Sequence, residues 1–377
     1  MTQRKHAEIA GAGFAGLVAA IALKQRGWSV RVHEKSDELR AFGAGIFIWE
    51  NGLRVLEAVG AYTQVLDGAF AAPAYESRTD GRCLSYNAIN GKSSYRLLTM
   101  TRQHLYGSIL ASARRHDIEI LTGSEAVGAS PEGELHLADG RRLPADLVVA
   151  ADGVRSKVRD SLSIPQQRRK YRDGIIRVLT DRTGFTGGEW DHVIDFWATA
   201  PEMLRILYTP CGPNLLYMAM MAPLENGEAN AVPVHPEPWI RCFPQLAPIL
   251  SRLGDAGRYD IYETTRLARW SQGRVAIVGD AAHAMPPTLA QGAGCAMMNA
   301  LGLAVAMEEF PAVPEALLHW EDRERPMTDH TQSRAAEIAE TRVLAAGMDW
   351  DDTGLLAARH IPTGTAGLTL SRACPAH

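Results

Sequence analysis

The chain has 377 residues, of which 46% are apolar and 22% charged, and a net charge of −4, so we expect a globular two-domain protein without a nucleic-acid or anionic-membrane partner. Its five cysteines lack CxxC spacing, which argues against a disulfide framework, a disulfide reductase and a zinc site, and we expect no metal. No apolar run approaches the length of a membrane span and the N-terminus lacks signal-peptide features, so we expect a protein of the reducing cytoplasm.

The first predicted unit, residues 7–34, is a strand, a glycine-rich turn, a helix and a second strand. Its turn reads GAGFAG from Gly11 to Gly16, and Glu34 follows the first glycine by 23 positions. In such a unit Gly11 allows the turn, Gly13 lets the backbone approach a pyrophosphate, and Gly16 lets the helix pack on the strand. The acid would bind the ribose hydroxyls of an adenosine. The unit predicts dinucleotide binding without choosing between NAD and FAD.

A second glycine-rich loop, residues 40–46, contains Arg40 and Gly45 and lies either near the cofactor or on the surface. In residues 70–98 strands no longer alternate with helices. Turn signals there separate short runs of alternating apolar and polar residues, as in an antiparallel sheet. Tyr75 lies in this region. Arg102 starts the next helix, where the positive end of the dipole disfavours a cation. Both an anionic partner and a solvated arginine are compatible with that position.

Residues 147–150 read as a buried strand, and Asp152 follows it at the place where ligands gather in open α/β sheets. Residues 171–265 are strand-like again and spaced like a meander. Arg177 and Arg205 each interrupt an apolar run there. An inward-pointing arginine needs an anion, whereas an outward-pointing one is solvated, which is the usual case.

The stretch 273–299 combines a buried strand, Asp280, a stiff Pro286–Pro287 loop and a helix start at Gly292-Ala293-Gly294. The carboxylate can accept hydrogen bonds from polyol hydroxyls, and a helix N-terminus can stabilise negative charge on a reduced isoalloxazine ring. The alternative is a plain βα turn. His283 could be a base, but packing within the loop is the safer interpretation.

The remainder of the chain after Asn299 predicts helices over residues 300–345, with breaks at Pro311, Pro314 and Pro326. Residues 346–377 form a tail rich in Gly, Thr and Pro that is too short for another domain.

Three signals therefore stand in order: the GAGFAG turn with Glu34, Asp152-Gly153, and Gly279-Asp280 with the helix start at Gly292. Together they resemble the single-component FAD-dependent aromatic hydroxylases of the para-hydroxybenzoate hydroxylase fold, over residues 5–345. The resemblance implies an α/β fold in which a Rossmann-like FAD-binding domain (1–72, 98–170 and 266–345) is interleaved with an antiparallel substrate-binding sheet (73–97 and 171–265). Asn299 departs from the family, in which many members carry an acid near this helix.

The same resemblance implies roles for individual residues. Asp280 would hold the ribityl chain, Arg102 would meet the FAD phosphates, and Asp152 belongs to a motif that serves both FAD and NAD(P)H. The full set of expected cofactor-binding residues is Gly11, Gly13, Phe14, Ala15, Gly16, Glu34, Lys35, Arg40, Gly45, Arg102, Asp152, Asp280, Pro287, Gly292, Ala293 and Gly294. The expected substrate-binding residues are Arg205, Tyr217, Tyr75, Tyr262 and Arg177, and no catalytic side chain is assigned.

Within the family, the segments around residues 33–57, 261–267 and 278–300 look most similar to the 2-methyl-3-hydroxypyridine-5-carboxylate and 5-pyridoxate oxygenases, ring-opening enzymes of vitamin B6 degradation. This implies non-covalent FAD, NADH or NADPH as co-substrate, O2, a flavin C4a-hydroperoxide and a hydroxypyridine carboxylate as substrate. Arg205 would pair with the substrate carboxylate. Plain hydroxylation of a hydroxynicotinate or a salicylate-like acid is the alternative, and a non-catalytic flavoprotein-like binding module is a more distant one. A monomer and a homo-oligomer both remain open.

Overall fold

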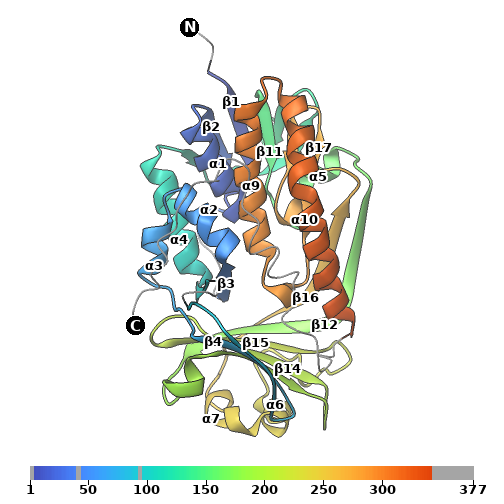
Figure 1. The fold of residues 1–377 in the computed structure, drawn as a ribbon. Coiled ribbons are helices and arrows are strands. Elements are labelled where there is room, and N and C mark those ends of the chain that lie inside the picture. Colours follow the sequence, from blue (N-terminus) through green and yellow to red (C-terminus); the bar gives the residue numbers. More distant parts are fainter. Residues whose placement is uncertain (1–3, 40–43, 92–95, 342–377) are drawn as a thin grey trace.

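The computed structural model describes residues 4–39, 44–91 and 96–341. In Figure 1 its upper part is built on a six-stranded sheet in the order β17-β18-β11-β1-β2-β7, parallel except for the β17–β18 pair. Apolar runs buried on both faces are typical of such a parallel sheet. The strands are β1 (His6–Ala10), β2 (Ser29–His33), β7 (Glu119–Leu121), β11 (Leu147–Ala150), β17 (Ser271–Gln272) and β18 (Val275–Ile277).

Helices cover this sheet, and α9 and α10 run side by side along one flank (Figure 1). α10 continues through Pro326, so the predicted break at that residue is wrong. Trp320 before it and Ala335 after it are both fully buried, so packing on either side holds the helix together despite the missing backbone donor. The helices here are α1 (Phe14–Gln25), α2 (Glu50–Ala58), α3 (Tyr62–Leu66), α4 (Arg102–Arg115), α5 (Lys157–Ser161), α8 (Asp280–His283), α9 (Gly292–Glu309) and α10 (Val313–Thr341).

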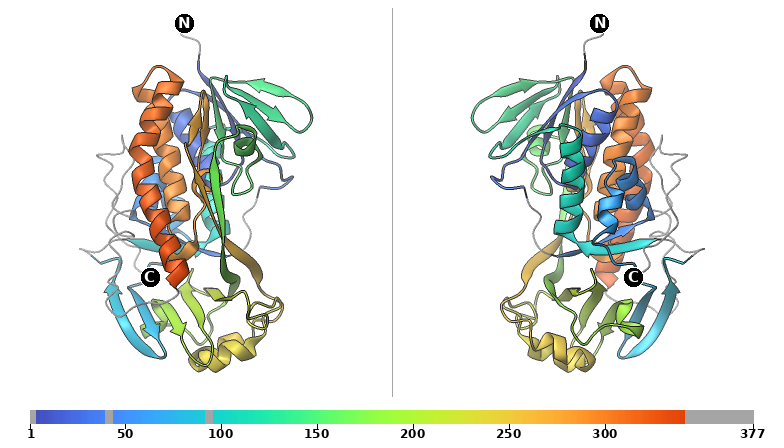
Figure 2. Two further views of the ribbon diagram at one scale, coloured as in Figure 1. Left: turned by 90° about the vertical axis from the view of Figure 1, so that its right-hand side faces the viewer. Right: turned by 90° about the vertical axis from the view of Figure 1, so that its left-hand side faces the viewer.

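The lower part is a seven-stranded sheet in the order β16-β12-β15-β14-β13-β4-β5, and the expected antiparallel meander is confirmed for β13, β14 and β15. One departure is that β4 joins β13 in parallel. β12 is long and passes from this sheet up along the other part of the molecule (Figure 2). The strands are β4 (Ala74–Thr79), β5 (Arg82–Ala88), β12 (Gln166–Asp181), β13 (Val193–Ala198), β14 (Leu204–Pro210), β15 (Leu215–Pro223) and β16 (Arg258–Leu267).

The two faces of the seven-stranded sheet have different neighbours because strand side chains alternate. The outer face carries Ile206, Tyr208 and Met220 and packs on Trp239 and Phe243 from the segment of α6 (Pro236–Cys242) and α7 (Ala247–Leu250). The opposite face turns toward the six-stranded sheet (Figure 1), and its residues Arg177, Arg205 and Tyr217 line a cavity there. The register therefore decides which residues can reach the cofactor domain.

Two small sheets complete the described chain. β3 (Gly45–Trp49) pairs with β6 (Leu97–Thr101) between the two parts, and β8 (Ala126–Ser130), β9 (Glu134–Leu137) and β10 (Arg142–Pro144) form a lobe at one edge (Figure 2). Short 3-10 turns lie at Gly188–Asp191, Pro244–Leu246 and Pro287–Leu289. None of the helices in the described ranges has the length and apolar character that a membrane crossing requires. The domain limits given above stay a prediction, and the tail 346–377 lies outside the described residues.

Candidate active site

Three adjoining cavities of about 350, 750 and 250 Å³ meet at Gly13, and the first two lie between the two parts of the molecule. From this glycine, one arm passes Glu34 and Asp152. The other arm passes Asp280 and ends against the seven-stranded sheet. An elongated ligand with a pyrophosphate at its middle has this shape, so the space suits the FAD that the sequence predicts.

The glycine turn at the junction of these arms has little room for side chains on its protein side. A Cβ at Gly11, whose φ is +97°, would lie 2.4 Å from the backbone oxygen of Ala151, and a Cβ at Gly16 would lie 2.0 Å from the oxygen of Gly11. Within the described residues, a Cβ at Gly13 would meet nothing within 4 Å. Gly13 therefore leaves open space on the cavity side, where the expected pyrophosphate would approach.

Glu34, predicted to bind the ribose, lies at the end of β2 and accepts backbone N–H groups of Ala12 and Ser36 at 2.9 and 3.0 Å. These bonds hold the carboxylate at the wall of the cavity. Lys35 is exposed and also lines this end, whereas Arg40 lies outside the described residues. Among the predicted cofactor residues, Phe14 and Ala15 line the other arm at the start of α1.

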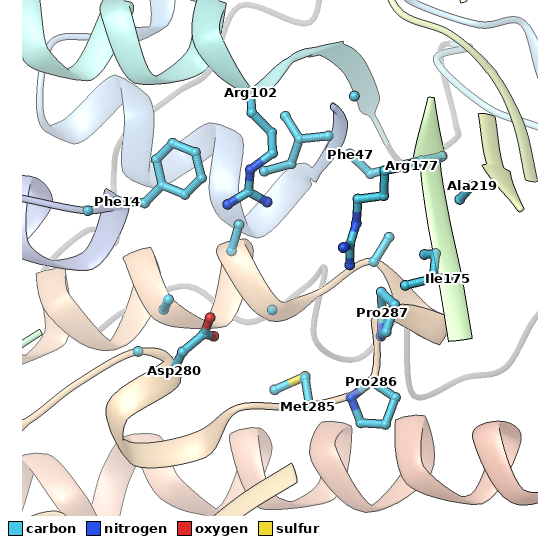
Figure 3. Close-up of a pocket in the computed structure, with 18 of the residues that line it drawn as sticks. Phe14, Phe47, Arg102, Ile175, Arg177, Ala219, Asp280, Met285, Pro286 and Pro287 are labelled. Carbon is cyan, nitrogen blue, oxygen red and sulfur yellow. The ribbon is translucent and has the colours of Figure 1, made fainter. Parts of the chain in front are cut away.

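Arg102 begins α4 and points into the cavity beside the ring of Phe14, with its guanidinium carbon 5.2 Å from the ring centroid (Figure 3). Within the described residues it forms no ion pair. Burial lowers the pKa of this guanidinium, and the charge of Asp280 across the cavity offsets part of that effect. A buried cation at a helix N-terminus is costly unless an anion reaches it, so an anionic ligand fits this position.

Asp280 begins α8 directly after Gly279, and its carboxylate projects into the space that Arg102 faces (Figure 3). It is exposed toward the cavities and has no ion-pair partner among the described residues. Pro286 and Pro287 form the rim, followed by α9, whose first residues are Gly292 and Ala293. No side chain of the described residues caps α9, so its N-terminal N–H groups are available to a ligand.

Gly294 has a different environment from the two residues before it. A Cβ there would lie 2.9 Å from the side-chain oxygen of Gln291 and 3.3 Å from the side chain of Asn51. The glycine lets α2 and α9 approach closely, so it shapes the helix start from behind and does not line the cavity itself.

Asp152 lines the adenosine arm, but both of its carboxylate oxygens already accept hydrogen bonds. Ser156 donates its hydroxyl to one, and the backbone N–H of Val158 lies 3.2 Å from the other. Burial raises the pKa of this carboxyl group, while these bonds work in the opposite direction. The visible contribution of Asp152 is therefore to hold the turn before α5.

At the sheet end, Arg205 of β14 is buried, and its Nε and Nη2 donate to the two carboxylate oxygens of Asp195 on β13 at 2.8 and 2.9 Å. The guanidinium carbon also lies 4.5 Å from the centroid of the Trp197 ring. Burial raises the pKa of the Tyr75 phenol on β4, the charge of Asp195 raises it further, and that of Arg205 lowers it. Asp195 is thus the anion that a buried Arg205 requires, and contact of Arg205 with a substrate stays a prediction.

Arg177 of β12 pairs with Asp260 of β16 and points into the cavity on the side opposite Phe14 (Figure 3). Its side chain is 25% exposed, so water screens this pair more than the buried one. Burial raises the pKa of Tyr217 on β15, and the nearby charge of Arg177 works in the opposite direction. Tyr217 packs directly over Gly45, where a Cβ would lie 2.4 Å from the tyrosine Cβ.

Tyr262 of β16 is 4% exposed and lines the adjoining cavity of about 750 Å³, and its hydroxyl has no hydrogen-bond partner among the described residues. A buried hydroxyl left unpaired costs free energy, so this one calls for a ligand or a water. The floor nearby is apolar and consists of Ile175, Leu207, Ala219 and Met221.

His283 lies behind the Asp280 turn and is 2% exposed. Its Nε2 lies 3.1 Å from the Asn299 amide nitrogen, which makes Nε2 the acceptor, and its ring packs against Trp270. Burial lowers its pKa to about 4. The packing interpretation therefore agrees with the geometry, and Asn299, whose role the sequence left open, links α9 to this histidine and to Thr328 of α10.

Sequence reasoning missed Asp195 and Asp260, the partners of the two pocket arginines. A signal existed, since Asp195 and Arg205 interrupt apolar runs in strands predicted to be neighbours. Two opposite charges on the same face of a hairpin are expected to pair, but the register needed to see this comes only with the structure.

A family model described as an FAD binding domain matches residues 5–335. A solved structure, the tetrameric form of 2-methyl-3-hydroxypyridine-5-carboxylic acid oxygenase, superposes with a TM-score of 0.91 and 48% identity over 96% of this chain and 97% of that chain. This similarity confirms the expected para-hydroxybenzoate hydroxylase fold.

Two curated relatives are named for the synthesis of a quinolone. AqdB1 of Rhodococcus erythropolis, assigned by name to 2-heptyl-3-hydroxy-4(1H)-quinolone synthesis, is 42% identical over 330 residues, 87% of this chain and 86% of that protein. The 2-heptyl-3-hydroxy-4(1H)-quinolone synthase of Mycobacteroides abscessus is 40% identical over 333 residues, 87% of this chain and 88% of that one.

Proposed function

The chain belongs to the FAD binding domain family and is an FAD-dependent monooxygenase, and from this premise we propose that it oxygenates a 3-hydroxypyridine carboxylate. The observation that carries the proposal is the pocket between the Asp280 turn and the seven-stranded sheet, which has an apolar floor and adjoins a cavity lined by the unpaired phenol of Tyr262. The similarity to the hydroxypyridine-carboxylate oxygenase over nearly the whole of both chains supports the same substrate class.

In this proposal the residues along the cavities hold FAD. Gly13 and the start of α1 receive the pyrophosphate, Arg102 neutralises a phosphate, and Glu34 accepts from the ribose hydroxyls. Asp280 accepts from the polyol chain, and the uncapped start of α9 at Gly292 and Ala293 stabilises negative charge on the ring. When bound, FAD supplies the redox chemistry, taking a hydride from NADH or NADPH and passing one oxygen atom of O2 to the substrate.

The substrate end binds and orients the ring. Ile175, Leu207 and Ala219 pack against an aromatic face and exclude water. Tyr262 hydrogen-bonds to the ring hydroxyl, which completes its own unmet bond. Arg177, whose guanidinium is held by a single acid and opens into the cavity, meets the carboxylate. No protein nucleophile is required.

The overall reaction consumes the acid, NAD(P)H, a proton and O2. The ring carbon beside the hydroxyl gains an oxygen, and if that carbon carries a methyl group, simple proton loss cannot restore the aromatic ring. Reduction of the second oxygen atom releases one water. One water then adds to the ring and a ring bond breaks, so that no water appears in the net reaction. With hydrogen at that carbon, the product is a hydroxylated ring plus water.

A second candidate is hydroxylation of a 4-quinolone, which the two curated relatives favour by name. Neutralisation of Arg205 by Asp195 favours it as well, because a quinolone brings no carboxylate. Both candidates share a nitrogen heterocycle with a hydroxyl or keto oxygen. The solved neighbour is described in tetrameric form, and we extend the proposal to a homo-oligomer of this chain.

The testing experiment is stopped-flow reduction of the bound flavin by NADH and NADPH with a panel of 5-hydroxynicotinate, 5-hydroxy-6-methylnicotinate, a 2-alkyl-4-quinolone and salicylate. We expect reduction to accelerate and product to form with the hydroxynicotinates. Acceleration and product with the quinolone alone would replace the first candidate by the second, and turnover with salicylate alone would exclude both.

A further inference from the structure

Arg205 and Asp195 form the most buried ion pair on the substrate face of the seven-stranded sheet. Their side chains are 9% and 4% exposed, and the two hydrogen bonds of 2.8 and 2.9 Å run in parallel from one edge of the guanidinium to both carboxylate oxygens. This arrangement is the strongest that an arginine makes with a carboxylate. Asp195 therefore occupies the position that a substrate carboxylate would otherwise take.

The strand register fixes this geometry. Arg205 lies opposite Trp197 and Asp195 lies opposite Leu207 in the β13–β14 pair, so the acid and the base are diagonal neighbours on one face. Arg205 and Leu207 line the cavity, while Asp195 sits beside them without lining it. The acid therefore acts on a ligand through the arginine.

The charge of the pair decides what can bind next to it. A buried arginine without a partner attracts an anion strongly, whereas the pair with Asp195 is neutral. A substrate carboxylate brought to Arg205 would place two anions around one cation in a poorly solvated space, at a cost in desolvation. A ring hydroxyl or keto oxygen carries no such cost and can still accept from the guanidinium.

We propose that Asp195 determines specificity at the sheet end of the pocket, neutralising Arg205 so that this position takes an uncharged ring oxygen and a substrate carboxylate is directed to Arg177. The inference rests on the proposed function in that it names which substituent of the heterocycle lies at Arg205. This role of Asp195 differs from a purely structural one. If the ion pair only held β13 and β14 together, replacing Asp195 would not change which ligand binds more tightly.

The test compares an acid with its amide on the same ring. FAD-loaded wild type and Asp195→Asn are titrated with 5-hydroxynicotinate and 5-hydroxynicotinamide while the flavin absorbance is followed. Unmasking Arg205 should shift the ratio of the two dissociation constants at least tenfold in favour of the acid. An unchanged ratio in a folded, FAD-loaded variant would overturn the inference.

Three further proteins make the result specific. Asp195→Glu keeps the charge and should keep the wild-type ratio within about threefold. Glu50→Gln breaks a comparable pair with Arg96, 14% and 8% exposed and away from the cavities, and should lower stability without moving the ratio. The double variant Asp195→Asn, Arg205→Gln removes both charges, so it remains testable even where Asp195→Asn fails to fold. The double variant should bind 5-hydroxynicotinate as tightly as wild type does. A large loss of this binding would show that Arg205 holds the carboxylate.

A ring-free probe separates this inference from the substrate proposal. Nitrate is a planar anion with the two-oxygen edge of a carboxylate. Arg177 is available to it in both proteins, so at constant ionic strength the flavin spectrum should report tighter nitrate binding to Asp195→Asn than to wild type. If wild type bound neither nicotinic ligand, the proposed substrate would fail while the nitrate titration still decided the role of Asp195. Equal nitrate affinity in both proteins would contradict it.

Discussion

The ring of Tyr217 fills the space directly above Gly45, so that an added Cβ at position 45 would lie 2.4 Å from the tyrosine Cβ and 2.5 Å from its Cγ. Gly45 begins β3, whereas Tyr217 belongs to β15 of the seven-stranded sheet. The contact therefore joins the cofactor side of the cavity to its substrate side, and it explains why a residue without a side chain stands at this point.

Gly45→Ala should displace the Tyr217 ring from the cavity wall. Neither atom in this contact is the flexible end of a side chain, so the cost should be that of an overpacked core, about 1–3 kcal/mol of unfolding free energy. Urea unfolding of the protein and titration with 5-hydroxynicotinate measure the two effects, and we expect weaker ligand binding with FAD retained. Wild-type values for both would show that Tyr217 yields without consequence.

Gly13→Ala and Gly11→Ala form a matched pair on the glycine turn. A Cβ at Gly13 meets no described atom within 4 Å, and the residue has an ordinary φ of −76°, so the apoprotein should keep its melting temperature. Its FAD affinity should fall on the order of tenfold, equivalent to about 1.4 kcal/mol, because the methyl group enters the expected pyrophosphate space.

Gly11→Ala should behave in the opposite way. Its φ of +97° and the 2.4 Å approach to the Ala151 oxygen predict a loss of about 2 kcal/mol or more of unfolding free energy, measured on the apoprotein. A destabilised Gly13→Ala apoprotein or an unaffected Gly11→Ala apoprotein would each contradict the assigned roles.

Asp280→Ala should lose FAD while the fold persists. The carboxylate is exposed in the cavity and has no ion-pair partner within the described chain, so the apoprotein should change by no more than about 0.5 kcal/mol. Losing a charged hydrogen bond to the cofactor should weaken FAD about 10- to 100-fold, from about 1.5–3 kcal/mol. Equilibrium dialysis against FAD, with Asp280→Asn as the isosteric control, checks this. Full retention of FAD by the alanine variant would remove Asp280 from the site.

Much of the fold could be predicted because short stretches of sequence determine the elements that form it. The glycine turn, the buried strand at 147–150 and the meander of β13 to β15 each follow from periodicity and turn residues. The predicted helix break at Pro326 is wrong, because packing of α10 on both sides of the proline outweighs the loss of one backbone hydrogen bond. Such tertiary support has no local sequence signature.

The candidate site divides in the same way. Gly13, Arg102 and Asp280 were predicted from motifs, and the structure brings all three to one cavity. What could not be predicted is the pairing of charges: Arg205 with Asp195 and Arg177 with Asp260. Each pair depends on strand register, and a one-residue slip would move either partner to the other face.

His283 should make stability depend on pH in a defined window. Burial lowers its pKa to about 4, against about 6.5 in an unfolded chain. Between these values the unfolded state binds more protons, so unfolding free energy should fall as pH drops from 6.5 toward 4, by roughly 3 kcal/mol in all. Urea unfolding of wild type and His283→Gln over pH 4 to 7 measures the difference, since the glutamine keeps an acceptor for Asn299. Parallel pH profiles would show that His283 titrates normally.

The most direct test of the central claim is product formation coupled to NAD(P)H oxidation. Purified FAD-loaded protein is supplied with 5-hydroxy-6-methylnicotinate, O2 and NADH or NADPH, and the nucleotide consumed, hydrogen peroxide and oxygenated product are quantified in the same reaction. An FAD monooxygenase of hydroxypyridine carboxylates should form about one product per nucleotide oxidised, with little peroxide. Nucleotide oxidation that yields an equal amount of peroxide and no product, with this acid and with 5-hydroxynicotinate, would contradict the proposed substrate.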